Sequence, residues 1–442
     1  MEEAFRMSST PTRWEARELE AMHGERQASW ERQWSYLWNN SDFYRRKFEA
    51  AGLQADKVPD LRDLSALPVT VKGEMRDSLD RRPPLGEHLA APRDSITQIQ
   101  TSSGTTGRPM AIALTKEDAD MFAEILRRGY VTVGFGPQDT VLHAFSMSRG
   151  WIGGLCMVQG YLKLGCTIMP IGVEAGRDKI LELMQIFRPT AISATPGFLI
   201  SLGERARELG LDPATLGMEH MLTGGEPGGG LPEVKAQLSS MWGATLREVM
   251  GGTDVTPICW AECEQEGGMH FIAADAVHFE IVDPETNEPK PIEEGVVGEL
   301  VYTHLNRQAT PVVRFKHRDI VRVTRTGPCS CGRSTPQIRC IGRADDMMII
   351  KGVNLFPSAI RALLSSIDGV GAEFRIVRPA GQYTLPGPVV IKVERAPEAS
   401  ITEQELGKLL HHKLSVAFDV RFVAPGETLV ATAHKSSYFE DA

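Results

Sequence analysis

The chain has 442 residues, 42% of them hydrophobic and 24% charged, which is enough for more than one domain with a sizeable core. Its net charge of −9 offers no basic surface for nucleic-acid phosphates. No stretch has the apolar length of a membrane span, and the polar N-terminus lacks the apolar segment of a signal peptide. We therefore expect a cytoplasmic protein without nucleic-acid or membrane partners.

The first predicted element is a helix with three tryptophans on one face, Trp30, Trp34 and Trp38. We favour packing of these indoles on the core over an aromatic platform for a base. From about residue 95, apolar runs alternate with amphipathic helices, which is typical of a layered α/β core. The predicted elements are a helix capped by Thr115 and Asp118, a helix ending before Pro189, strands 190–195 and 245–249, and a helix beginning at Pro232.

Near residue 277 the pattern changes to alternating strands, which predicts a β-rich part with strands at 277–281, 300–304 and 312–315. The remainder then forms a compact α+β unit with helices at 358–367 and 403–414 and strands near 374–377 and 389–393. We predict an α/β fold with two domains. A large N-terminal domain covers residues 1–342, and a small C-terminal domain covers residues 343–442.

Small and hydroxylated residues crowd the segment 101–109, TSSGTTGRP. Glycines let backbone N–H groups approach an anion, hydroxyls add donors, and an arginine adds charge. The segment lacks the Gly-Lys-Ser/Thr of the nucleotide-binding P-loop. We predict a phosphate-binding loop formed by Ser102, Ser103, Gly104, Thr105, Thr106, Gly107 and Arg108.

Further motifs follow in order along the chain: SDFYRRKF (41–48), LRDLSALPVTVKGEMR (61–76), TGGEPGG (223–229), PVVRFKHRD (311–319), CSCGR (329–333) and GRADDMMIIKGVNLFPS (342–358). With TSSGTTGRP, this series resembles the adenylate-forming superfamily of acyl-CoA synthetases, adenylation domains and luciferases. Within it, the sequence is most similar to the phenylacetate–CoA ligase family. The resemblance covers nearly the whole chain.

The resemblance implies the nucleotide-binding residues. Adenine would lie against the turn Gly225, Glu226 and Pro227. The ribose hydroxyls would bind Asp319, since a carboxylate accepts two hydroxyl hydrogen bonds. Arg343 would lie near the ribose and phosphates, and Asp345 would be the hinge about which the C-terminal domain rotates.

The predicted catalytic residues are Lys435, Asp254 and Thr105. Lys435, in TAHKSSYF, stands where the family has a catalytic lysine, whose cation offsets the charge that develops on the transferred phosphate. Asp254 stands where the family has a glutamate that binds Mg²⁺, and it keeps a hard oxygen ligand with a shorter reach. His434 replaces the glycine that usually precedes the lysine.

The stretch Met250-Gly251-Gly252-Thr253-Asp254 replaces the family's Tyr-Gly-x-Ser/Thr-Glu. We assign Met250, Gly251 and Thr253 to the nucleotide site. Met250 replaces the aromatic ring that would stack on adenine, and its thioether still packs against a ring with a smaller stacking contribution.

Seven cysteines in a chain of this length do not make a disulfide scaffold. Three sulfurs and one imidazole form a closed tetrahedral set for structural zinc, here Cys263, His270, Cys329 and Cys331. Some members of the resembled family carry zinc at matching positions. Free thiols remain the alternative, and Cys259 is a competing ligand.

We place the acyl pocket in the segment 143–154, with His143, Phe145, Trp151 and Gly153, where small residues leave room for an aromatic or alicyclic acid. The first hypothesis is an acid–CoA ligase that uses ATP, Mg²⁺ and coenzyme A. A second hypothesis keeps the acyl-adenylate but transfers it to an amino acid, as in coronafacate ligase. A third is a non-catalytic nucleotide-binding protein. We also consider a homodimer as its assembly.

Overall fold

The computed structural model describes residues 10–101, 110–148, 150–226, 228–344, 346–351, 353–367, 369–379, 384–385, 387–396, 399–428 and 438–441. Several predicted site residues lie outside these ranges. They are Ser102, Ser103, Gly104, Thr105, Thr106, Gly107, Arg108, Pro227, Asp345, His434 and Lys435.

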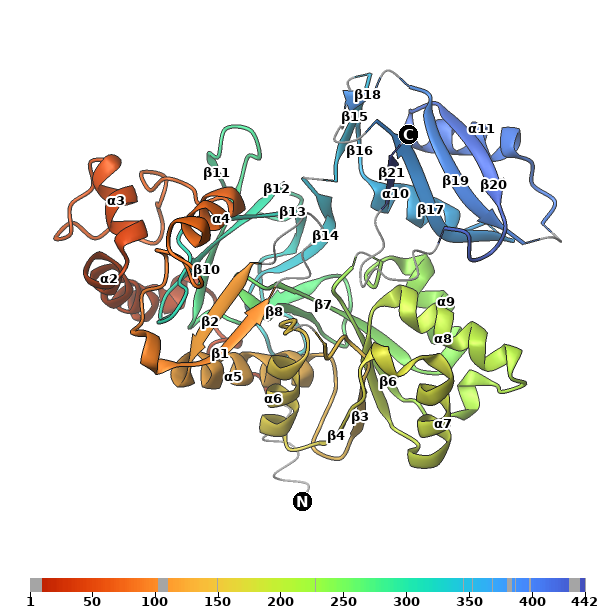
Figure 1. Ribbon diagram of the computed structural model, residues 1–442, viewed down its shortest axis with the longest axis horizontal. Helices are drawn as coiled ribbons and strands as arrows, with labels where there is room; N and C mark the ends of the chain where they lie inside the picture. Colours follow the sequence, from red (N-terminus) through yellow and green to blue (C-terminus); the bar gives the residue numbers. More distant parts are fainter. Residues whose placement is uncertain are drawn as a thin grey trace.

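One long sheet crosses the large domain in the order β11-β10-β12-β13-β14-β9-β8-β7-β6-β5-β3-β4 (Figure 1). Its parallel end consists of β3 (Thr140–His143), β4 (Thr167–Pro170), β5 (Ala191–Ala194), β6 (His220–Thr223) and β7 (Thr245–Gly252). The helices between these strands are α6 (Leu155–Leu164), α7 (Arg177–Phe187), α8 (Pro196–Glu208) and α9 (Pro232–Trp242). Loops that follow parallel strands all emerge at one edge of a sheet, where ligands bind in open α/β folds.

The other end of the sheet is antiparallel, beginning with the pairing of β7 and β8. Its strands are β8 (Thr256–Glu262), β9 (Met269–Phe271), β10 (Val277–Val282), β11 (Pro289–Lys290), β12 (Val297–His304), β13 (Phe315–Arg325) and β14 (Gln337–Arg343). This end is the predicted β-rich part.

The N-terminal helices α2 (His23–Asn40), α3 (Asp42–Ala50) and α4 (Lys72–Arg81) lie beside the antiparallel end. A hairpin of β1 (Ile96–Thr101) and β2 (Ala111–Thr115) follows, and it leads into α5 (Lys116–Thr132). Short 3-10 helices are η1 (Glu20–Met22), η2 (Arg93–Ser95), η3 (Val173–Ala175) and η4 (Pro213–Thr215). Trp30 and Trp34 are fully buried, so the prediction that they pack on the core is confirmed.

The C-terminal unit, blue in Figure 1, has its own sheets and helices. Strand order is β20-β19-β17-β21 in one sheet and β16-β15-β18 in the other. The elements are β15 (Met348–Ile350), β16 (Val353–Leu355), α10 (Pro357–Leu364), β17 (Val370–Arg378), β18 (Thr384–Leu385), β19 (Val389–Arg395), α11 (Glu403–Leu414), β20 (Phe418–Val423) and β21 (Phe439–Asp441). Its core cluster draws only on described residues from Met348 onward.

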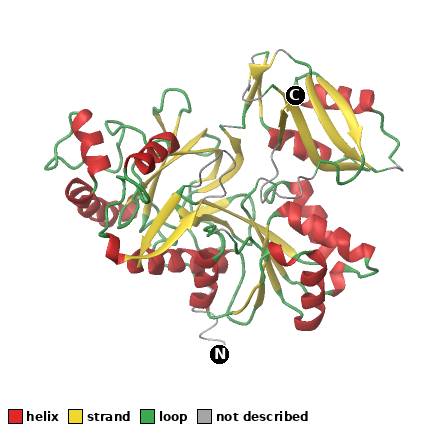
Figure 2. Ribbon diagram, in the orientation of Figure 1, coloured by secondary structure: helices red, strands yellow, loops and turns green. Residues whose placement is uncertain are grey.

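The α/β fold class is confirmed, as Figure 2 shows by its mixture of helices and strands. The capping boxes at Thr115 and Thr402 are both present. The strand predicted at 312–315 is wrong except for its last residue, because β13 begins at Phe315. Arg314 adopts a φ of 42°, which an extended strand does not allow. The domain boundary at 342/343 stays a prediction.

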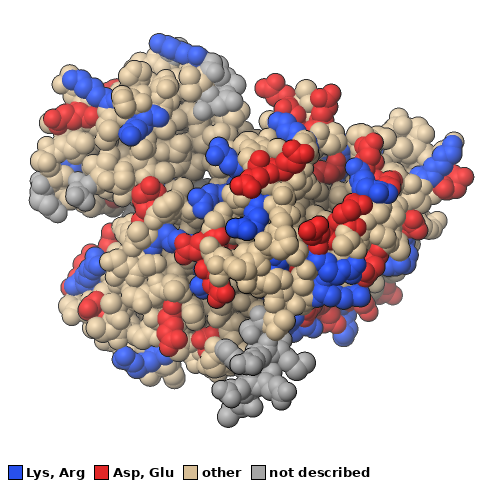
Figure 3. Space-filling view, turned by 180° about the vertical axis from the view of Figure 1, so that it is seen from behind, with Lys and Arg blue, Asp and Glu red and all other residues tan. Residues whose placement is uncertain are grey.

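Among the described residues, no helix combines the length and the apolar character needed to cross a bilayer. On the face shown in Figure 3, basic and acidic side chains are interspersed.

Asp118 joins the start of α5 to a distant loop. Its carboxylate accepts the N–H groups of Thr115 (3.2 Å), Gln308 (2.8 Å) and Ala309 (2.9 Å). The Arg307 Nε atom lies 3.6 Å from the same carboxylate, and both side chains have an exposed fraction of 0%. A buried charge with this many donors fixes the loop against the helix.

We expect Asp118→Ala to lower the free energy of unfolding by about 3 kcal/mol, because it leaves the buried Arg307 guanidinium without its counter-charge and three N–H groups without their acceptor. Urea unfolding followed by tryptophan fluorescence measures the change. Asp120→Ala is the matched control, since Asp120 is exposed and pairs only with Lys116 in the described structure. Equal effects of the two substitutions would contradict the assignment.

Candidate functional site

The turn predicted to bind adenine meets the predicted acyl pocket at the C-terminal edge of the parallel strands. Gly225 follows β6 with a φ of 81°. A Cβ placed on Gly225 would lie 3.7 Å from Phe145, 3.8 Å from Thr195 and 4.0 Å from Trp151. The rings of Phe145 and Trp151 meet edge to face, with centroids 5.9 Å apart. Loops after β3, β5 and β6 therefore converge on one place.

His143 supports this pocket from behind. It has an exposed fraction of 0%, and its Nε2–H donates to the Gly153 carbonyl over 2.9 Å while Nδ1 lies 2.9 Å from the Ser193 hydroxyl. Burial lowers the pKa of His143 to about 4, so the ring is neutral at pH 7. A Cβ on Gly153 would lie 2.3 Å from the Trp151 ring, so only glycine fits beneath the indole. His143 thus acts on the pocket through the Gly153 backbone and does not line it directly.

The predicted phosphate loop begins beside the same pocket. The Thr101 N–H, at the end of β1, donates to the Gly150 carbonyl over 2.7 Å, and Thr101 forms a parallel bridge with Trp151. Residues 102–108 follow directly in the sequence. Thr101, the last described residue before this segment, therefore lies next to Trp151.

One carboxylate that the sequence analysis missed holds the pocket loop. Glu174, in η3, accepts hydrogen bonds from the Ser148 hydroxyl (2.7 Å), the N–H groups of Met147 (3.2 Å) and Ser148 (3.3 Å), and the Ser146 hydroxyl. Partial burial alone would raise the pKa of Glu174, but these hydrogen bonds hold it at about 2. The carboxylate is ionised throughout the physiological range and keeps the loop before Trp151 in one conformation.

β7 ends with Met250, Gly251 and Gly252, and Thr253 and Asp254 follow in the turn to β8. A Cβ on Gly251 would lie 2.4 Å from the carbonyl oxygens of Thr256 and Pro257, so the β7–β8 turn closes directly on this glycine. Asp254 is 7% exposed, and the Lys72 ammonium group lies 3.5 Å from its carboxylate. Lys72, at the start of α4, brings a cation to the predicted metal ligand.

Asp319 lies between an arginine and a histidine. Arg343 Nη1 donates to its Oδ1 over 2.9 Å, and His317 Nδ1 lies 2.6 Å from its Oδ2. Asp319 and Arg343 are opposite each other in the β13–β14 ladder, which explains their contact. The structure thus brings the two predicted ribose-side residues together.

Gly252 connects this pair to β7. A Cβ on Gly252 would lie 1.8 Å from His317 Nε2, so the histidine ring rests on the bare glycine backbone. The ring also meets Tyr302 edge to face, with centroids 5.4 Å apart. Gly252 and Tyr302 together therefore restrict the position of His317.

Glu248 lies beneath the turn predicted to bind adenine. One of its carboxylate oxygens would lie 2.3 Å from a Cβ on Gly230. Burial, and then the charge of Glu262, raise the pKa of Glu248 to about 7. This carboxyl is therefore part protonated near neutral pH.

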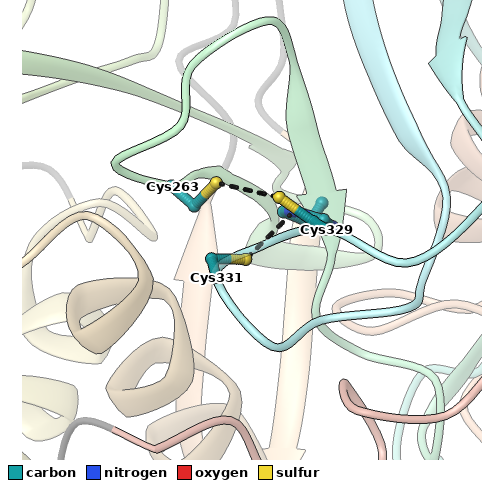
Figure 4. Close-up of side chains that lie close together, drawn as sticks. Cys263, Cys329 and Cys331 are labelled. Carbon is teal, nitrogen blue, oxygen red and sulfur yellow. Dashed lines mark hydrogen bonds between the residues drawn. The ribbon is translucent and has the colours of Figure 1, made fainter.

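Cys263, His270, Cys329 and Cys331 form a cluster whose ligand atoms all lie within 4.8 Å of one another (Figure 4). His270 Nδ1 donates to the Thr335 carbonyl over 3.1 Å, which leaves Nε2 facing Cys331 at 3.5 Å. Hydrogen bonding from Cys263, and then from His270, lowers the pKa of Cys331. Cys259 instead contacts the Tyr302 hydroxyl at 3.7 Å, so it is no competing ligand here.

The cluster lies far from the nucleotide residues. β8 begins next to Asp254 and ends next to Cys263. A strand of this length spans about 20 Å. The cluster and the nucleotide residues thus occupy opposite ends of the same strand.

Two family matches cover most of the chain: AMP-binding enzyme over residues 44–306 and AMP-binding enzyme C-terminal domain over residues 352–442. The chain belongs to the AMP-binding enzyme family. The phenylacetate–coenzyme A ligase of Thermus thermophilus is 34% identical over 78% of this chain and 75% of its own length. The phenylacetate–coenzyme A ligase of Escherichia coli is 31% identical over 81% of this chain and 79% of its own length. The protein is an adenylate-forming ligase of the phenylacetate–CoA ligase family.

Solved structures of 2-hydroxyisobutyryl-CoA ligase are 28% identical to this ligase over 97% of its chain and 91% of theirs. The structure with 2-HIB-AMP in the postadenylation state gives a TM-score of 0.89. The structure with 2-HIB-AMP and CoA in the thioesterification state gives 0.72. This member of the AMP-binding enzyme family therefore resembles the postadenylation arrangement more closely.

Sequence reasoning missed Glu174, Lys72, Gly252 and His317 as parts of this site. His317 precedes Asp319 by two residues in the motif PVVRFKHRD, and in a strand such as β13 that spacing puts both side chains on one face. Lys72 lies within a family motif, but its partner Asp254 is 182 positions away, so only the fold reveals the pair. Glu174 belongs to no quoted motif.

We expect Gly252→Ala to lower kcat/KM for ATP by about 10- to 100-fold, because the methyl group displaces His317 and with it Asp319. Initial rates of pyrophosphate release at varied ATP measure the effect. Gly24→Ala is the control, since a Cβ there meets nothing within 4 Å. An unchanged KM for ATP in Gly252→Ala would show that the His317 position does not matter for nucleotide binding.

Proposed function

We propose that this ligase activates a carboxylic acid with ATP and Mg²⁺ and then transfers the acyl group to coenzyme A. One observation supports the proposal: Gly225, the rings of Phe145 and Trp151, and Thr101, which precedes the predicted phosphate loop, meet at the edge of the parallel strands. In the first step the acid's carboxylate attacks the α-phosphorus of ATP, and pyrophosphate leaves. The acyl-adenylate is the product of this step.

We assign each residue a role in the reaction from its chemistry. Residues 102–108 would hold the departing phosphates with N–H groups, hydroxyls and Arg108. Asp319, held by Arg343 and His317, would accept the two ribose hydroxyls. Asp254 is the proposed Mg²⁺ ligand, and the proposed roles of Lys72 and Lys435 are to offset phosphate charge in the transition state.

Phe145 and Trp151 support an acid with an aromatic or alicyclic group. Their edge-to-face rings meet beside Gly225, where an apolar ring could pack. Coenzyme A is the proposed acceptor, because phenylacetate–coenzyme A ligases and 2-hydroxyisobutyryl-CoA ligase, all named for this thioester chemistry, match most of the chain. Bound CoA would attack the mixed anhydride with its thiol and release AMP.

We expect pyrophosphate release with ATP, Mg²⁺ and at least one acid from a panel of aryl, alicyclic and short hydroxy acids. Mass spectrometry should then find the acyl-CoA product when CoA is added. A product seen with an amino acid and not with CoA would establish the amide-synthetase alternative. No release across the panel would support the non-catalytic alternative. Lys435→Ala is the companion variant: its release should fall at least about 100-fold if the cation stabilises the transition state.

We also propose that zinc binds the cluster of Cys263, His270, Cys329 and Cys331. The donor set fits the metal, because three sulfurs and one imidazole nitrogen are the ligands of closed structural sites. The bond from His270 Nδ1 to Thr335 supports this, since an outer-sphere carbonyl commonly orients a histidine ligand. Zinc there would bind β8 and β9 to the loop between β13 and β14, and would have no catalytic task.

We expect about one equivalent of zinc in freshly purified protein, and a lower thermal midpoint after chelation. Cys331→Ser should lose the metal, because it removes one of four ligands. Cys259→Ser should keep it, since that thiol lies against Tyr302. Metal analysis that finds less than about half an equivalent would count against the site.

A further inference from the structure

Arg361 is a buried cation on the C-terminal unit. It lies on α10 with an exposed fraction of 3%, and its Nη2 is 2.5 Å from Oε1 of Glu373 on β17. The guanidinium carbon lies 5.5 Å from the centre of the Tyr438 ring. These contacts anchor the arginine within its own unit.

The same guanidinium faces the nucleotide turn of the large domain. A Cβ on Gly228 would lie 3.6 Å from Arg361 Nη1. Glu226, two residues earlier, interacts electrostatically with both Arg361 and Glu373. Arg361 therefore connects the C-terminal unit to the predicted adenine turn of the large domain.

Glu226 is itself held in place. Its Oε1 accepts the Gly197 N–H, at the start of α8, over 2.7 Å. A Cβ on Gly197 would lie 2.9 Å from this oxygen and 3.8 Å from Oε1 of Glu373. The carboxylates of Glu226 in the large domain and Glu373 in the C-terminal unit thus both lie close to Gly197.

Two carboxylates this close repel each other unless a cation lies beside them. Burial of Glu373 raises the pKa of its carboxyl group. The charge of Arg361 lowers this pKa by a smaller amount, so the net shift is upward. Arg361 supplies the positive charge that makes the approach favourable. Without it, the approach of the C-terminal unit to the turn would bring like charges together.

We propose that Arg361 is a positioning residue for adenylation, holding the C-terminal unit against the nucleotide turn at Glu226 and Gly228. This inference rests on the proposed function. Arg361 keeps Glu373 and Tyr438 when the C-terminal unit moves, because all three belong to that unit. It loses Glu226 and Gly228, which stay with the large domain.

The contact of Arg361 with Glu226 and Gly228 therefore favours the arrangement of the two units in which it forms. That arrangement resembles the postadenylation structure of 2-hydroxyisobutyryl-CoA ligase, at a TM-score of 0.89 against 0.72 for the thioesterification state. An interaction present in only one state shifts the equilibrium toward that state. Loss of Arg361 should weaken the adenylation step and spare the transfer step.

Separate assays of the two half-reactions test this. We expect Arg361→Gln to lower kcat/KM for ATP in pyrophosphate release at least about 10-fold. CoA acylation from a separately synthesised acyl-adenylate should stay within about 3-fold of the wild type. Arg361→Lys should keep part of the ATP-dependent rate, because it retains the charge without the planar fork.

Arg378→Gln is the matched control. Arg378 is also buried in the C-terminal unit, on β17, where its guanidinium carbon lies 3.7 Å from the centre of the Phe439 ring. We expect this variant to keep the ratio of the two half-reaction rates. Equal losses in both half-reactions for Arg361→Gln, or the same pattern in both variants, would overturn the proposal.

Two further measurements distinguish a failure of this proposal from a folding defect and from a failure of the proposed function. If Arg361→Gln does not fold by circular dichroism, Arg361→Lys carries the comparison of half-reactions. If the wild type releases no pyrophosphate with any acid, the proposed function fails. Calorimetric titration with a non-hydrolysable ATP analogue then tests Arg361 directly: weaker binding in the variant supports its contact with the turn, and unchanged affinity overturns it.

Discussion

The proposed nucleotide site depends on β7, which is hydrogen-bonded to a parallel strand on one side and to an antiparallel strand on the other. β7 pairs in parallel with β6 and antiparallel with β8, so it is the strand where the two ends of the sheet meet. A parallel neighbour sends its connecting loop to the C-terminal edge, and an antiparallel neighbour returns immediately from that edge. The adenine turn after β6 and the Met250–Asp254 stretch therefore lie side by side. His317 on β13 reaches the same edge, since its ring lies directly against Gly252.

The site is fixed more by backbone segments that lie in close contact with other elements than by the length of its side chains. Gly251 and Gly252 each touch another element where a Cβ would intrude. Because the contacts are with backbone or buried rings, the neighbours have little freedom to yield. Charged groups are placed on this rigid frame by paired contacts, such as Asp319 with Arg343. Groups held in this way need little reorganisation when a charged nucleotide binds.

Local patterns predicted the fold well, since capping boxes and apolar periodicity depend on neighbouring residues. The α5 and α11 caps and the change to a β-rich part were all predictable in this way. Residues 312–314 have the apolar pattern of a strand but form a buried loop, with the Arg314 guanidinium turned inward to Glu280. The motifs predicted which residues form the site, and that assignment stays a prediction. The contacts within the site were not predictable, since Gly252 meets His317, and Arg361 meets Gly228, only after distant segments fold together.

The two parts of the molecule are joined differently from the elements within each. The apolar core of the C-terminal unit contains only its own described residues, so no shared core binds it to the large domain. The contacts between them include the Ser358 hydroxyl on the Ile341 carbonyl (2.6 Å) and Arg361 beside Gly228. An interface made of polar contacts without a shared apolar core is typical of domains that move relative to one another. We expect the C-terminal unit to change its orientation by exchanging these polar contacts, while the frame around β7 keeps its shape.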